Sequence, residues 1–177
     1  MSLPGVVAFG EVGLDYTIPS AEWESQRKML THLLKELRGA IGGKPHVIHC
    51  REAVCPTPQK AEEDLLVILR REVPADQPIQ VHYFNGNKTA VDRWLQAFPN
   101  TYFSVGDAAT TFTQQQKEGL ANIPKDRFLL ESDAPYAAPQ MAAKGVTKRR
   151  LISHPYTLIQ VAWGLWLRFT KRLSPLC

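Results

Sequence analysis

The sequence predicts an α/β fold in which short parallel strands alternate with helices. Five short apolar runs recur along the chain, and a helical or polar stretch follows each of them. Parallel neighbours need a crossover connection, so this alternation favours a parallel sheet. The runs are apolar at nearly every position, as strands buried on both faces are. Five such units form either an open doubly wound sheet or part of an eight-stranded barrel, and the pattern alone does not choose between the two.

The boundaries of these elements follow from punctuating residues. Ser20 is placed to cap the first helix and Gly39 to stop it. Thr113 is expected to open a short polar helix that ends before Pro124. The expected strands cover residues 6–9, 46–48, 79–81, 102–105 and 128–130.

Composition limits the class of protein without fixing its function. The chain has 177 residues, 44% of them hydrophobic and 21% charged, which predicts one soluble domain with a sizeable core. The net charge of +4 permits a polyanionic partner without requiring one. Three cysteines with no CxxC pair favour a reducing intracellular compartment, nuclear or cytoplasmic. The most apolar stretch, residues 158–167, is too short to span a bilayer, so no membrane is expected.

Carboxylates and imidazoles fall where four of the predicted strands leave the core. Glu11, His49, His82 and Asp133 each follow an apolar run. The carboxyl ends of parallel strands meet at one edge, where α/β folds build their active sites. We therefore expect the four side chains to gather at this edge.

Two imidazoles and two carboxylates suit a divalent cation. Imidazole favours zinc, and carboxylate oxygen favours magnesium or manganese. Taken singly, a histidine at a strand end is more often a structural hydrogen-bonding residue, and Asp133 before Ala134-Pro135 could cap a turn. Four such residues on four strands favour the metal site over these separate roles.

The residues around these four positions resemble a known family. The matching segments follow one another in the family's order and spacing, over roughly residues 5–160. They are GEVGLDY at 10–16, GKPHVIHCREA at 43–53, HYFNG at 82–86, FPNTYFS at 98–104 and LLESDAPY at 129–136. They are similar to the GExGLDY, KPxVIHCREA, HCFTG, FPNxYFS and LLETDAPY motifs of TatD-type deoxyribonucleases, and the opening residues 3–9 look closest to the vertebrate-type branch.

The resemblance implies a TIM-type (β/α)8 barrel of the amidohydrolase superfamily, here incomplete. The five predicted strands would correspond to strands four to eight. The family's first strand carries a His-x-His pair that completes one of two metal sites, and no His-x-His occurs in this sequence. The expectation is a single partial barrel over 1–177, read as a fragment, an alternative transcript or an incomplete gene model, in which one metal ion or fewer is well held. Residues 137–153 form a basic loop, and 158–177 a divergent C-terminal helix or tail.

The resemblance also implies roles for individual residues. Glu11, His49, His82 and Asp133 would bind the metal ions (Mg, Mn or Zn), and Asp133 would act as general base. Arg51, two residues beyond His49, could bind a phosphate or form a surface salt bridge with Glu52 or Asp15. Glu131 and Asp15 could orient the ligands, although Glu131 could instead be a buried partner of a lysine.

Three functions stay open at this point. The first is a metal-dependent nuclease that hydrolyses phosphodiester bonds in DNA, or in RNA, by metal-activated water. The second is an amidohydrolase acting on a small molecule. Glu11 argues against this function, because enzymes of that class usually carry a carbamylated lysine at the same position. The third is a truncated chain, catalytically weak or inactive, that acts as a binding or scaffold protein.

Overall fold

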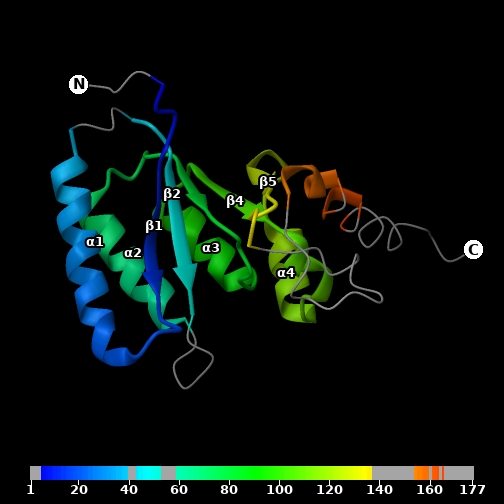
Figure 1. Cartoon of the computed structure of the whole chain (residues 1–177), viewed down its shortest axis with the longest axis horizontal. Coiled ribbons are helices and arrows are strands. Elements are labelled where there is room, and N and C mark those ends of the chain that lie inside the picture. Colours follow the sequence, from blue (N-terminus) through cyan, green and yellow to red (C-terminus); the bar gives the residue numbers. More distant parts are fainter. Residues whose placement is uncertain are drawn as a thin grey trace, which may run out of the picture. The chain divides into compact units, whose positions relative to one another are not determined.

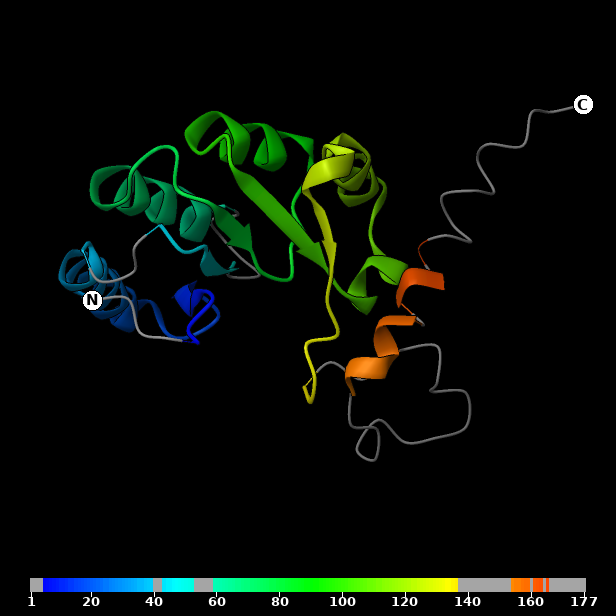
Figure 2. The ribbon, with the colours of Figure 1, turned by 90° about the horizontal axis from the view of Figure 1, so that it is seen from above.

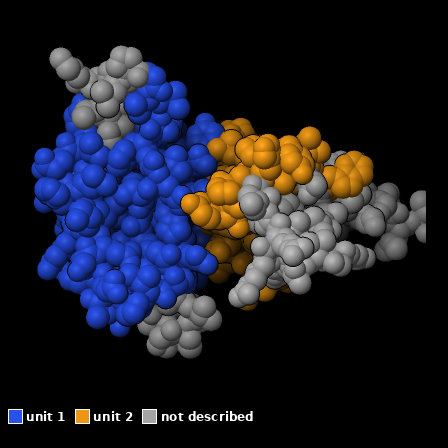
Figure 3. All heavy atoms as spheres, viewed as in Figure 1, with its two compact units in different colours: residues 1–82, 90–102 blue, residues 83–89, 103–177 orange. Residues whose placement is uncertain are grey.

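A computed structural model describes residues 5–39, 43–52, 59–136, 154–159, 161–163 and 165 of the 177-residue chain. The chain divides into two compact units, shown in different colours in Figure 3. The first unit comprises residues 1–82 and 90–102, and the second comprises residues 83–89 and 103–177.

The first unit is built on three parallel strands. Strand β2 (His46–Arg51) pairs in parallel with β1 (Phe9–Asp15) on one side and with β3 (Ile79–Val81) on the other. A short 3-10 turn, η1 (Ser20–Glu22), leads into helix α1 (Trp23–Leu37). Helix α2 (Lys60–Glu72) connects β2 to β3, and most of α3 (Lys88–Ala97) belongs to this unit as well.

Apolar side chains close the space between these strands and the helices. Helix α1 packs against β1 and α2, and α2 packs against β1 and β2 (Figures 1 and 2). Leu14, Ile48, Leu65, Leu69 and Ile79 are fully buried between them. This core fixes the backbones of the three strands, and therefore the side chains at their carboxyl ends.

The second unit contains the remaining two strands. Strand β5 (Phe128–Leu130) pairs in parallel with β4 (Thr101–Val105), whose residues from Phe103 onward belong to this unit. Between them lie η2 (Asp107–Thr111), α4 (Gln114–Asn122) and η3 (Lys125–Arg127), and η6 (Pro155–Thr157) follows later in the chain. The phenyl rings of Phe84 and Phe103 meet edge to face at 4.8 Å in the core of this unit.

Several predicted elements are confirmed. The five strands are present, and each strand pair described is parallel. Thr113 caps α4 through a capping box with Gln116, in which each side chain bonds the other residue's backbone N–H, and the helix ends at Asn122, before Pro124.

Three predicted boundaries were wrong. The first strand was expected at 6–9 but covers residues 9–15, because the parallel ladder with β2 continues from Val12 to Asp15. The second strand was expected at 46–48 but continues to Arg51, so both Glu11 and His49 lie within their strands rather than after them. Ser20 does not cap α1, because it lies in the preceding turn η1 and Glu22 occupies the cap position.

Strand β5 is more exposed than predicted, because the sequence pattern indicated strands buried on both faces. In β5, the side chains of Leu129 and Leu130 are each 38% exposed. In the described ranges, none of the helices is long and apolar enough to cross a membrane. The predicted basic loop at 137–153 lies outside the described residues, as does most of the predicted tail at 158–177.

Candidate active site

Two glycines allow β1 to approach β2 closely. A Cβ atom at Gly13 would lie 1.8 Å from the carbonyl oxygen of His49, and one at Gly10 would lie 2.5 Å from that of Val47. Gly10 also has a φ of +148°, a conformation that other residues rarely adopt. Glu11 stands between these two glycines, so the close approach of the strands holds its side chain beside β2.

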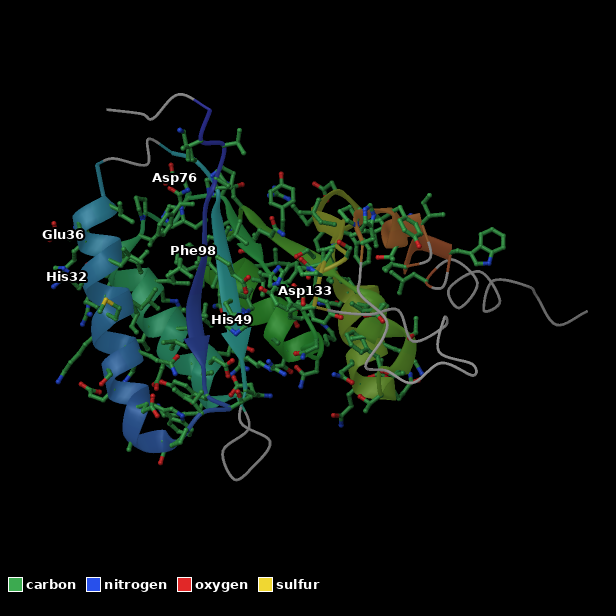
Figure 4. All side chains as sticks on the ribbon, viewed as in Figure 1. His32, Glu36, His49, Asp76, Phe98 and Asp133 are labelled. Carbon is green, nitrogen blue, oxygen red and sulfur yellow. The ribbon has the colours of Figure 1, made fainter. Side chains whose placement is uncertain are left out.

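The carboxylate of Glu11 lies next to both histidines of the first unit. Its Oε1 atom is 2.6 Å from Nδ1 of His49 and 3.6 Å from Nε2 of His82. The backbone N–H of His82 donates to the carbonyl of Ile48 at 2.9 Å, which fixes the end of β3 against β2. Three successive strands thus bring one carboxylate and two imidazoles together, and Figure 4 labels His49 on β2.

A second carboxylate lies on the other side of the His49 ring. Oδ2 of Asp15 is 3.6 Å from Nε2 of His49, so each ring nitrogen of this histidine faces an acid. Although partial burial opposes ionisation, hydrogen bonds from Thr17 and the charges of His49 and Arg51 hold the pKa of the Asp15 carboxyl below its usual value. Asp15 therefore adds fixed negative charge beside the imidazole.

Helix α1 holds Asp15 in place through Gln26. The side-chain oxygen of Gln26 accepts from the backbone N–H of Asp15 at 2.8 Å, and its amide group donates to the carbonyl of Asp15 at 2.7 Å. These two bonds satisfy both backbone groups of Asp15, as a neighbouring strand would. Sequence reasoning missed Gln26, because nothing in its spacing separates it from the other polar residues of an amphipathic helix.

Arg51 and Glu52 follow His49 at the end of β2 and have different surroundings. The Glu52 carboxylate accepts from the backbone N–H groups of Ala61 (3.0 Å) and Glu62 (2.8 Å), at the N-terminus of α2. Arg51 is exposed and, among the residues that the structure describes, forms no ion pair with either Glu52 or Asp15. Its charge nevertheless helps to hold the pKa of the Asp15 carboxyl low, so the role of Arg51 stays a prediction.

The second unit positions Asp133 and Glu131 after β5. Asp133 has a φ of +48°, a left-handed conformation that aspartate tolerates better than most residues, and its carbonyl accepts from the N–H of Tyr136 at 2.8 Å. Oε2 of Glu131 accepts a hydrogen bond from the buried hydroxyl of Ser104 at 2.8 Å. A serine of β4 is thus one of its partners.

The four predicted metal ligands are divided between the two units. Glu11, His49 and His82 lie together in the first unit, and Asp133 belongs to the second (labelled in Figure 4). The gathering of all four around one cation stays a prediction.

The residues of the first unit fit a divalent cation by their chemistry. A carboxylate oxygen and two imidazole nitrogens are donors that zinc and manganese accept. In the described part of the chain, however, no group of three or more His, Cys, Asp or Glu side chains is already arranged to hold an ion. The short contact between Glu11 and His49 is a hydrogen bond that joins two of these donors directly.

Comparison with known families gives this arrangement a context. The family described as TatD related DNase matches residues 1–165. The chain belongs to this family. Glu11, His49 and His82 all lie within the matched residues.

Two relatives show how much of a TatD-family protein this chain covers. It is 37% identical over 159 residues to the human 3'-5' RNA nuclease TATDN2, which covers 86% of this chain and 18% of the human protein. It is 32% identical over 138 residues to the metal-dependent hydrolase YcfH of Escherichia coli K12, which covers 76% of this chain and 47% of that protein. The chain thus spans less than half the length of these relatives.

A solved structure supports the fold. The crystal structure of YJJV, a TatD homologue from Escherichia coli K12, superposes with a TM-score of 0.70 at 24% identity, covering 92% of this chain and 56% of that one. At this level of identity the likeness concerns the fold alone. The five parallel strands of this chain agree with part of such a barrel.

Proposed function

We propose that this chain carries the hydrolytic site of a divalent-metal-dependent nuclease that cleaves phosphodiester bonds in DNA or RNA. The observation that carries the proposal is the position of Glu11, whose Oε1 atom lies within 3.6 Å of imidazole nitrogens from both His49 and His82. The names of relatives support it, because one is a 3'-5' RNA nuclease and another a metal-dependent hydrolase.

In this proposal Glu11, His49, His82 and Asp133 hold Mg, Mn or Zn. A bound divalent cation lowers the pKa of a bound water molecule and neutralises charge on the phosphate. Each imidazole must be neutral to bind a cation, and each carboxylate must be ionised. Because protons compete with a cation for these donors, cation affinity should weaken as the pH falls.

The remaining polar residues act on the substrate or on the ligands. The Asp133 carboxylate would accept a proton from the attacking water, as a general base does. The exposed guanidinium of Arg51 is available to bind a phosphate oxygen through charge-assisted hydrogen bonds. Asp15 would keep the ring of His49 oriented, and Glu131, anchored by Ser104, would do the same for the turn that carries Asp133.

The test is a nuclease assay on the purified chain with labelled single-stranded DNA and RNA, in the presence of Mg, Mn or Zn in turn. Glu11→Gln and Asp133→Asn should each abolish cleavage, and so should a chelator. Glu36→Gln is the matched control, because Glu36 is an exposed acid on α1. Cleavage that survives both site variants would belong to a contaminant or to a different site, and would refute the proposal.

A second candidate function has its own observation. The exposed leucines of β5 leave apolar surface on an outer strand, and such strands invite pairing with another chain. A chain that covers part of a barrel could therefore act as a binding or scaffold protein without catalysis. This alternative predicts a chain that cleaves no substrate with any of the three metals and that forms oligomers in analytical ultracentrifugation.

A further inference from the structure

Tyr83, which directly follows His82 in the sequence, is held rigidly within the second unit. Its hydroxyl donates to Oδ1 of Asp107 at 2.8 Å. Its φ is +49°, a left-handed conformation that is unusual for a bulky aromatic residue. Such a conformation persists only where the surrounding contacts hold the residue in place. A Cβ atom at Gly106 would lie 2.3 Å from the edge of the Tyr83 ring, so the ring rests directly on the glycine backbone.

The two residues stand where strands end. Tyr83 comes two residues after β3, and Asp107 comes two residues after β4. Asp133 comes three residues after β5 in the same unit.

The chemistry of this ring differs from that of the family motif. The HCFTG motif has a cysteine at this position, and this chain has a tyrosine that is only half-buried. Tyr83 directly follows His82, a cation ligand in the proposed function, and a fixed aromatic ring there can act as a stacking platform, because every nucleobase presents a π-face to it. Immobilising the ring in advance removes most of the entropy that stacking would otherwise cost.

Building on the proposed function, we propose that Tyr83 binds the substrate by stacking on the base of a nucleotide next to the cleaved bond. Asp107 is then a positioning residue, since it acts on the substrate only through the tyrosine. Gly106 is needed because any larger residue would displace the ring. This assigns a base contact to an enzyme site that would otherwise contact only the phosphate.

The experiment compares enzyme variants with substrates that lack a single base. Binding is measured by fluorescence anisotropy, with Mn²⁺ present, on a single-stranded phosphorothioate oligonucleotide that resists cleavage. Three further oligonucleotides each carry one abasic residue, at the first, second or third position from the 3′ end. For the unmodified chain, one of these positions should weaken binding roughly 5- to 150-fold, the range for loss of a base–aromatic stack.

The variants distinguish stacking from a merely structural role. In Tyr83→Cys, binding of the intact oligonucleotide should weaken by the same factor, and the abasic residue should then have no further effect. Tyr83→Phe keeps the ring and should keep most of the abasic effect. Asp107→Ala should lose part of it, and Asp107→Asn, which retains a hydrogen-bond acceptor, should restore it. Tyr156→Cys, at an exposed tyrosine of η6, is the matched control.

Each outcome decides between the two proposals. If Tyr83→Cys shows the same abasic effect as the unmodified chain, or weakens binding no more than Tyr156→Cys, stacking by Tyr83 is refuted while the nuclease proposal stands. If the unmodified chain neither binds nor cleaves any oligonucleotide, the proposed function is refuted, and the role of Tyr83 with it. Far-ultraviolet circular dichroism identifies any variant that fails to fold. If Tyr83→Cys is such a variant, the abasic effects measured on Tyr83→Phe and Asp107→Ala decide the question.

Discussion

Replacing Gly13 with alanine should destabilise the first unit and disturb the predicted ligands together. The added methyl group would lie 1.8 Å from the carbonyl oxygen of His49, whereas ordinary contacts begin at 3.4 Å. One strand must therefore move by about 1.6 Å, a shift that a close-packed interior does not absorb freely. Overpacking of this kind costs about 1–3 kcal/mol. In a chain of this length, a cost of about 2 kcal/mol corresponds to a melting temperature lower by roughly 4–8 °C.

The matched control is Gly39→Ala. A methyl group added at Gly39 would meet nothing within 4 Å, and this glycine needs no left-handed backbone. Its substitution should leave stability unchanged or raise it by about 0.4–1 kcal/mol, through the entropy of the unfolded chain. Urea denaturation followed by tryptophan fluorescence measures both variants. Equal stability of Gly13→Ala and Gly39→Ala would refute the argument that Gly13 permits the close approach of β1 to β2.

Two further predictions concern stability. Thr113→Ala removes the capping box of α4 and should lower the free energy of unfolding by about 1 kcal/mol in urea denaturation, while the exposed Thr111→Ala should change it less. Burial raises the pKa of the Glu62 carboxyl to about 6, although Arg93 opposes the shift. Because the folded state then keeps its proton to a higher pH than the unfolded chain does, this carboxyl lowers stability as the pH rises from about 4.5 to 6. Relative to the unmodified protein, Glu62→Gln should gain roughly 1–2 kcal/mol over this window, and a pH-independent difference would contradict the assignment.

The alternation of strands and helices could be predicted from the sequence because it depends on local patterns. Apolar runs bounded by prolines, glycines and polar turns mark β2, β3 and β5 to within a few residues. The first strand was misplaced because its pairing is not local. Val6 and Val7 look like a strand, yet both side chains are exposed, and the ladder with β2 runs through the less apolar residues that follow.

The meeting of Glu11, His49 and His82 could also be expected, because it follows from the register of parallel strands. Gly13 pairs with His49 and Ile48 pairs with Val81, which brings the carboxyl ends of the three strands together. The 2.6 Å contact itself could not be predicted from the pairing, because the register of β1 against β2 shifts between Phe9 and Val12, where Glu11 lies. The position of Asp133 depends on a longer path through the chain, which no local pattern fixes.

The partners that hold these residues could not be predicted, because long side chains reach them from distant elements. Gln26 binds the backbone of Asp15 from a helix, and Asp107 binds Tyr83 across 24 residues of sequence. A glycine such as Gly106 signals that something approaches the backbone, but it does not say which side chain does so. Only the fold shows that the approaching group is the ring of Tyr83. The same reasoning applies to Gly13, which marks a close approach of β2 to β1, while the strand register decides that His49 is the residue that makes it.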